Sequence, residues 1–355
     1  MGLRSFVIKR IAFAVVLLIM AMSFNFYLFM VMPGDPTELF IPPRGITREQ
    51  RDAMIASFRH VWGLDQPLYL QYLVYLKRMF SWDFGTSLVN QNSVSAEIML
   101  RLPWTLLLMG GSAIIAIVVG VVLGVYIAQK RGTKLDVGML SLSLITNSLP
   151  VFWLAMVFVL IFTKNLGVFP PSKAYPDNWG VSVPFPQPVI SGFNSTSSGM
   201  NVVFNINSAD IGTFLWGYFS HAFLPLLTLS VFQFGGFVLL TRATMLESLT
   251  EDYIVTARAK GVPERSVLFK HALKNASLPI ITSVALTFGF VLSGAIITET
   301  VYSWPGLGQW IYRSVSASDY FSMQAIFFII TLCVIIANIV ADLLYGVVDP
   351  RIKYG

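Results

Sequence analysis

Six long apolar stretches constrain the fold of this chain more than any other feature of its sequence. A helix needs about 20 mainly apolar residues to cross the hydrocarbon core of a bilayer, and each stretch is long enough to do so. Hydrophobic residues make up 55% of the chain and charged residues only 12%, a balance too apolar for a soluble globular protein. We therefore predict an all-α integral membrane protein with six transmembrane helices, near residues 11–32, 102–129, 135–163, 217–241, 279–300 and 323–346.

Lysine and arginine gather between alternate apolar stretches and predict the orientation of the chain. Cytoplasmic segments of membrane proteins hold the positive excess, except that loops beyond about 60 residues cross largely regardless of charge. The basic segments here are the N-terminus, residues 130–134, residues 242–278 and the C-terminus. We therefore expect both termini in the cytoplasm.

The first stretch is too long for a signal peptide and lacks a small-residue cleavage site, so we expect it to remain as the first span.

Residue types that carry catalysis are sparse and scattered. The only cysteine, Cys333, lies in an apolar run, and His60, His221 and His271 stand in no metal-binding spacing. Neither a GxSxG elbow nor a nucleotide-binding P-loop is present. We predict no catalytic residue, no metal site and no cofactor in this chain. If ATP drives this protein, we expect another chain to bind the ATP and Mg²⁺. The basic residues form no stripe with aromatic residues, so nucleic acid is not an expected partner.

A secondary transporter and a membrane enzyme are competing interpretations of such a chain. The first would carry its own coupling-ion site and often internal repeats, and the second would cluster nucleophiles, bases or metal ligands at one depth. The sequence has no repeated halves and no such cluster.

The segments outside the apolar stretches divide the chain into regions. Residues 1–32 hold the N-terminus and the first span, residues 33–101 an external domain, and residues 102–355 a core with the other five spans. In the external domain, Thr47 and Gln50 form a capping-box pattern that predicts a short helix through about His60. Residues 164–215 are rich in Pro, Asn, Ser and Gly, which predicts an external insertion of irregular or short-strand structure. Residues 242–278 form a cytoplasmic loop.

The cytoplasmic loop carries the most informative pattern. Tyr253, Ala257 and Gly261 fall at four-residue spacing on one helix face, Gly261 suits a helix C-terminus, and Pro263 suits the start of the next helix. We expect a short helix beside the membrane whose small residues let a partner surface approach closely. Charge pairing at the rim of that contact would come from Arg258, Lys260 and Arg265. A solvated connector is the alternative, as for most basic loops.

The loop from Tyr253 to Gly261 resembles the EAA loop in permease subunits of ATP-binding-cassette (ABC) importers, specifically those of the dipeptide/oligopeptide permease family. The form expected there, Tyr-x-x-Thr-Ala-Arg-Ala-Lys-Gly, is present, although Val255 stands where the general motif has a glutamate. The resemblance covers nearly the whole chain. Its other motifs are Pro33-Gly34-Asp35-Pro36, Gly63-Leu64-Asp65-Gln66-Pro67, Arg101-Leu102-Pro103, Glu299 to Gly308, and Asp342 to Arg351.

The resemblance implies a type I importer permease in the cell membrane of a prokaryote. Such a chain pairs with a second homologous permease as a heterodimer, receives solute from an extracellular solute-binding protein and is driven by two ATPase subunits. The implied cargo is oligopeptides, with oligosaccharides or nickel as alternatives. The implied ATPase-coupling residues are Asp252, Tyr253, Thr256, Ala257, Arg258, Lys260 and Gly261.

Two further groups of residues are candidates for the pathway itself. Asn147, Gln233 and Asn338 lie within apolar stretches, where polar groups usually face a cavity or a neighbouring helix, and we favour hydrogen bonding between helices. Pro150 and Pro225 predict kinks.

A loop with an aromatic anchor is expected to dip at the external mouth, where it would gate the pathway or contact the binding protein. Its residues are Glu299, Trp304, Pro305 and Gly306.

Overall fold

The computed structural model describes residues 3–31, 47–63, 65–87, 89–174, 211–291 and 295–348. These residues are mainly helical, and one isolated bridge pairs Thr86 with Ser93. The helices are α1 (Leu3–Val31), α2 (Arg48–Trp62), α3 (Leu68–Phe80), α4 (Val94–Gln129), α5 (Lys134–Ser148), α6 (Val151–Phe158), α7 (Ile211–Leu249), α8 (Asp252–Ala259), α9 (Glu264–Ser266), α10 (Leu273–Val291), α11 (Ile296–Val301), α12 (Leu307–Ser316) and α13 (Tyr320–Val348). Turns of π-helix continue α6 over Val159–Asn165 and α9 over Val267–Ala272.

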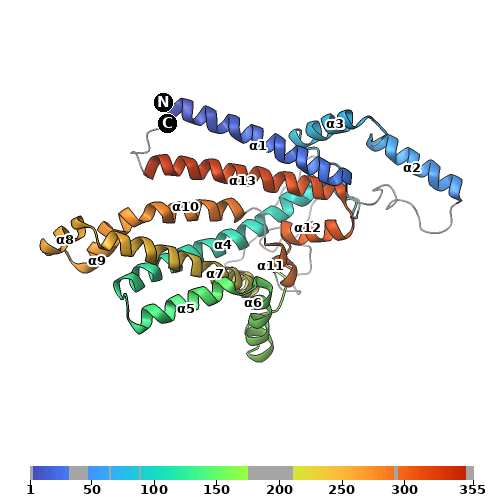
Figure 1. Ribbon diagram of the computed structural model, residues 1–355. Coiled ribbons are helices and arrows are strands. Elements are labelled where there is room, and N and C mark those ends of the chain that lie inside the picture. The colour runs from blue at the N-terminus through green and yellow to red at the C-terminus, as the bar shows by residue number, and fades with distance from the viewer. Residues whose placement is uncertain are drawn as a thin grey trace.

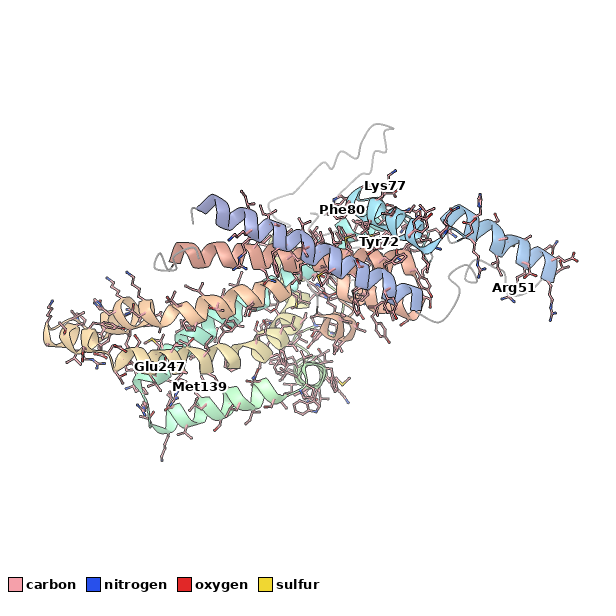
Figure 2. The ribbon with its side chains drawn as sticks, turned by 45° about the horizontal axis from the view of Figure 1, so that its top comes forward. Arg51, Tyr72, Lys77, Phe80, Met139 and Glu247 are labelled. Carbon is pink, nitrogen blue, oxygen red and sulfur yellow. The ribbon has the colours of Figure 1, made fainter. Side chains whose placement is uncertain are left out.

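The long helices lie side by side in one bundle with two distinct ends (Figure 1). Helix α1 packs on α13, α13 packs on α10, and α7 contacts α4, α5 and α10. The start of α1 and the end of α13 lie at the same end of the bundle as α8 and α9, whereas α3, α6, α11 and α12 lie toward the other end. Helix α2 projects beyond that second end, and Figure 2 shows Arg51 there, far from Glu247 on α7.

Four of the helices in the described residues are long and apolar enough to cross a membrane. They are Ile8–Leu28 in α1, Val94–Gln129 in α4, Leu215–Leu249 in α7 and Tyr320–Val340 in α13, which correspond to four of the expected spans. An all-α membrane fold is therefore confirmed for the described residues.

The expected span over residues 135–163 is divided into two helices. Helix α5 ends at Ser148 and α6 begins at Val151, with a bend of 105° between the two halves. Pro150 stands at the break as the residue before α6, where it removes one helical hydrogen bond because it lacks an amide hydrogen. The kink expected at Pro150 is thus a sharp corner, and the pair of helices counts as a fifth span only if both halves are taken together. Helix α7, in contrast, runs on through Pro225.

The expected span over residues 279–300 is also divided. Helix α10 ends at Val291, and the short helix α11 begins at Ile296. The first turn of α10 holds Lys274 and Asn275, so its apolar run is shorter than that of α4 or α7.

The most extensive helix contact in the bundle joins α4 to α7. Gly120 and Gly124 share one face of α4. A Cβ atom built on Gly120 would lie 2.5 Å from Phe237 Cβ, and one built on Gly124 would lie 2.6 Å from Thr241 Cβ. Gly235 brings α7 equally close to α5, because a Cβ there would lie 2.5 Å from the Ser143 carbonyl oxygen. Small residues of this kind let membrane helices approach closely enough for extensive van der Waals contact.

The capping box at the start of α2 is confirmed. The amide of Gln50 donates to Thr47 Oγ1 at 3.3 Å, and the amide of Thr47 donates to Gln50 Oε1 at 3.0 Å. The helix ends before Gly63, whose φ of 68° is left-handed. The expected turn at residues 33–36 and most of the insertion, residues 175–210, lie outside the described residues.

The glycine contact predicts a difference between two otherwise similar substitutions on α4. Gly120→Ala should lower the free energy of unfolding by about 1–3 kcal/mol, because its methyl group meets the α7 backbone as well as Phe237. Gly110→Ala has no atom within 4 Å of its new methyl group and should keep or raise stability, since alanine favours a helix over glycine by about 1 kcal/mol. Thermal unfolding of the detergent-solubilised protein measures both; equal melting temperatures for the two variants would contradict the close contact.

Candidate functional site

The loop between α7 and α10 forms the short helix expected from its sequence. Helix α8 has Asp252 in its first turn, where a negative charge is favourable. Its end is set by Gly261, which has a φ of 74° and donates its amide hydrogen to the Arg258 carbonyl at 2.9 Å. Pro263 lies directly before α9. The local signals for a helix stop and restart are thus confirmed.

One face of α8 is buried in the chain's own core. Ile254 is fully buried and Ala257 is 7% exposed, and both pack in a cluster with Met245 of α7 and Val267 after α9. Tyr253 is anchored beside them, because its hydroxyl is 2.5 Å from Ser248 Oγ, which in turn donates to the Ala272 carbonyl at 2.9 Å. The expectation that Ala257 faces a partner is wrong in this structure, because helical spacing identifies a face without saying what covers it.

The outward face of α8 is formed by exposed residues. They are Asp252, Val255, Thr256, Arg258 and Ala259 of the helix, followed by Lys260 and Gly261 directly after it. Arg258 donates to both carboxylate oxygens of Glu264, at 2.7 and 3.2 Å, so its charge pairs within this chain. This hydrogen bonding holds the pKa of the Glu264 carboxyl below its usual value. Thr256 Oγ1 donates to the Asp252 carbonyl and stays within the helix.

An open groove of about 290 Å³ lies beside the start of α8. Its lining residues come from the end of α7, the start of α8 and the start of α10: Thr244, Glu247, Ser248, Glu251, Tyr253, Asn275, Ala276 and Pro279. Glu247 and Glu251 are both exposed. The groove and the outward face of α8 together form a surface at this end of the bundle, which we call the α8 surface.

At the other end of the bundle, the loop that carries Glu299 is held by buried polar contacts. The Glu299 carboxylate is fully buried; it accepts from Thr105 Oγ1 at 2.9 Å and from the Gln309 amide at 3.0 Å. Thr105 Oγ1 also accepts from the Leu307 amide at 2.8 Å. Gly306 has no space for a Cβ atom, because the Glu299 carboxylate and Thr105 Oγ1 occupy that position. This loop is therefore clamped to α4 and to the start of α12.

Trp304 is fully buried in the same region. Its Nε1 donates to the Trp104 carbonyl at 3.0 Å, and the two indole rings meet edge to face with centroids 5.4 Å apart. The expected contact of Glu299, Trp304 and Gly306 with a binding protein is thus wrong for this conformation, since none of the three is accessible. Pro305 is half-buried. Long-range packing onto α4 decides this burial, and the local sequence of the loop does not reveal it.

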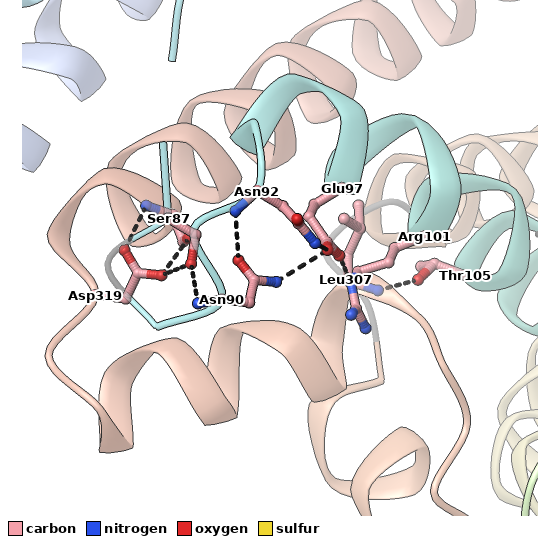
Figure 3. Close-up of polar contacts among 9 residues, drawn as sticks. Ser87, Asn90, Asn92, Glu97, Arg101, Thr105, Leu307 and Asp319 are labelled. Carbon is pink, nitrogen blue, oxygen red and sulfur yellow. Dashed lines mark hydrogen bonds and ion pairs between the residues drawn. The ribbon is translucent and has the colours of Figure 1, made fainter. Parts of the chain in front are cut away.

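A second polar network, which sequence reasoning missed, lies next to this loop (Figure 3). Glu97 at the start of α4 accepts from Asn90 and Asn92, each at 2.9 Å, and from Arg101 Nε at 2.8 Å. Beyond Asn90, Ser87 donates to Asp319 before α13. The four-residue spacing of Glu97 and Arg101 was a signal for their ion pair, but nothing local indicated the asparagines.

The three expected pathway residues occupy different surroundings. Asn147 is exposed on α5 and Asn338 is half-buried on α13. Gln233 Nε2 donates to the Leu229 carbonyl at 3.1 Å and to Ser112 Oγ of α4 at 3.4 Å, which is the favoured use as a link between helices. In the described part of the chain, no group of three or more His, Cys, Asp or Glu residues is placed to hold a metal ion.

Comparison with known proteins gives matches over nearly the whole chain. Residues 120–354 match the family described as the binding-protein-dependent transport system inner membrane component, and residues 3–109 match the N-terminal part of such components. An oligopeptide transport system permease protein of Bacillus subtilis is 35% identical and covers 99% of each chain. A dipeptide transport system permease protein of Escherichia coli is 33% identical over 98% of each, and a glutathione transport system permease protein of Salmonella choleraesuis is 33% identical over 99% of each.

The clamp around Glu299 generates a second prediction. Thr105→Val keeps the shape of the side chain but leaves the Glu299 carboxylate and the Leu307 amide each without one hydrogen bond, at a cost of about 1–3 kcal/mol per group. Thr331→Val is the control, because Thr331 Oγ1 bonds only to the Phe327 carbonyl of its own helix. We expect a clear fall in melting temperature for the first variant and almost none for the second. A Thr105→Val protein as stable as the control would contradict the clamp.

Proposed function

Since the chain belongs to the family of binding-protein-dependent transport system inner membrane components, we propose that it forms half of the translocation pathway for oligopeptides in an ABC importer. The chain is a multi-pass membrane permease subunit of the peptide type and not an enzyme. The observation that carries the choice of oligopeptides is the 35% identity with an oligopeptide permease over 99% of both chains.

The α8 surface is the contact that we assign to the ATPase subunits, which bind ATP and Mg²⁺. The coupling residues divide into two roles. Thr256, Arg258 and Lys260 face outward to meet the partner, whereas Tyr253 and Ala257 hold α8 on the chain's own core. Asp252 and Gly261 set the start and the end of the helix. A short helix fixed in this way acts as a lever between two states of the importer.

The two ends of the bundle support an orientation for the chain. Both α1 and α13 have their terminal ends at the α8 end, so an ATPase contact there places the N- and C-termini in the cytoplasm of a prokaryote (Figure 1). The opposite end, with α2, α3 and the Glu299 loop, is then external and receives solute from a binding protein. Six spans result when α5 and α6 are taken as one broken span and α10 is added to the four continuous ones.

The partner that completes the pathway is a second homologous permease in a heterodimer. Helices α4 and α5 carry exposed apolar residues such as Ile114, Val118, Leu144 and Ile145, which suit lipid or a neighbouring permease. The Glu299 loop, clamped to α4, is the gate that we place at the external mouth.

Uptake of labelled solutes tests this function. A strain that lacks this gene should lose uptake of a labelled oligopeptide and regain it when the wild-type gene is restored. Uptake of an oligosaccharide should be the same in all strains. Loss of oligosaccharide uptake with normal peptide uptake would overturn the proposed cargo, and failure of the ATPase subunits to co-purify with the chain would overturn the importer.

Gly261 provides a specific test of the coupling surface. Gly261→Leu should abolish transport and leave solute capture by the binding protein intact, because a side chain there distorts the end of α8. The left-handed backbone makes the change cost about 1–2 kcal/mol. Gly167→Leu is the matched control: Gly167 has a φ of 64°, has no neighbour within 4 Å of a new Cβ and lies after α6. Peptide uptake compares the two variants, and unchanged uptake by Gly261→Leu would remove Gly261 from the coupling surface.

A further inference from the structure

A buried ion pair joins α5 to α7 near the point where α7 leads into α8. Arg242 Nε donates to Asp136 Oδ1 at 2.6 Å, and Arg242 Nη2 donates to Asp136 Oδ2 at 2.8 Å. Asp136 is 2% exposed and also accepts the amide hydrogen of Gly132 at 2.9 Å. A two-point contact of this kind fixes the angle between the two side chains as well as their distance.

The pair differs from the other arginine-carboxylate fork near α8. Arg258 and Glu264 have similar distances, but their side chains are 46% and 41% exposed, so water and salt screen the attraction. The side chains of Arg242 and Asp136 are 19% and 3% exposed. Loss of either partner would therefore leave the other charge buried and uncompensated. The intact pair thus holds the two helices in a single relative position.

Helix α7 transmits any displacement of α8. Two residues separate Leu249 at the end of α7 from Asp252 at the start of α8, and their amides bond back to Glu247 and Ser248. The contacts of Tyr253 with Ser248 and of Ile254 with Met245 add side-chain links. A force on α8 thus reaches Arg242 within the last turns of α7.

Helix α5 continues this path toward the other end of the bundle. It packs against α7 a second time at Gly235, and it leads through the 105° corner into α6. There the Tyr302 hydroxyl, next to the Glu299 loop, donates to the Ala155 carbonyl of α6 at 3.3 Å. Within the described residues, the two hydrogen bonds of this pair are the ones that join α5 to α7, so without them packing alone would hold the two helices together.

We propose that Asp136 and Arg242 form a positioning pair that makes α5 and α7 move as one body when α8 is displaced, so that ATP hydrolysis is coupled to solute movement. The inference rests on the proposed function and adds to it a pair of residues outside the α8 surface.

The experiment uses the complete importer in proteoliposomes, with its second permease, its ATPase subunits and its binding protein. The uptake of radiolabelled trialanine and the hydrolysis of ATP are measured together, and their ratio gives peptides moved per ATP. Asp136→Asn should lower this ratio about tenfold while ATP hydrolysis continues, an effect within the usual range for coupling between sites. Arg242→Lys keeps the charge but loses the fork and should lower the ratio less. Lys134→Gln, which changes an exposed charge on the same turn of α5, should leave it unchanged.

A wild-type ratio in Asp136→Asn overturns the positioning pair. If that variant fails to assemble, Arg242→Lys decides: a lowered ratio supports the pair and a wild-type ratio overturns it. A wild-type importer that hydrolyses ATP and moves no peptide would refute the proposed function, and the coupling role would fall with it. A merely structural pair would change yield or melting temperature and leave the peptides moved per ATP unaltered in the protein that assembles.

Discussion

The close contact between α4 and α7 is the constraint on which the rest of the bundle depends. In a bilayer the lipid is as apolar as the helix surfaces, so helices associate through van der Waals packing and hydrogen bonds. Gly120 and Gly124 supply the packing, and Ser230 and Gln233 add hydrogen bonds to Ser112 across the same interface. Because α5 and α10 also pack on α7, the position of every later span depends on this pair.

The two ends of the bundle are stabilised by different interactions. The α8 end rests on an apolar cluster around Ile254 and Met245, with Tyr253 and Ser248 at its edge. The opposite end depends on buried polar groups, above all the Glu299 carboxylate and Thr105. Buried polar groups are costly unless satisfied, so they specify one arrangement of the Glu299 loop.

Local signals in the sequence predicted local structure well. Hydropathy identified the four continuous spans, Thr47 and Gln50 predicted the start of α2, and Gly261 predicted the end of α8. What failed depended on contacts between distant parts of the chain. Ala257 and Trp304 were expected at surfaces and are buried, because in so apolar a chain the pattern does not distinguish a face toward the core from one toward a partner. Asp136 and Arg242 lie too far apart in sequence for their pairing to be visible there.

Helix α7 gives these separate features a common mechanical basis. Thr228 of α7 is hydrogen-bonded to Tyr302 beside the Glu299 loop, and Ser248 of α7 is hydrogen-bonded to Tyr253 of α8. At 1.5 Å per residue these two points lie about 30 Å apart, close to the thickness of the hydrocarbon core. The only proline within α7, Pro225, precedes both points, so an unbroken helix connects them. A displacement at α8 would therefore reach the Glu299 loop without crossing a break in α7, provided that α5 and α4 hold α7 in register along its length.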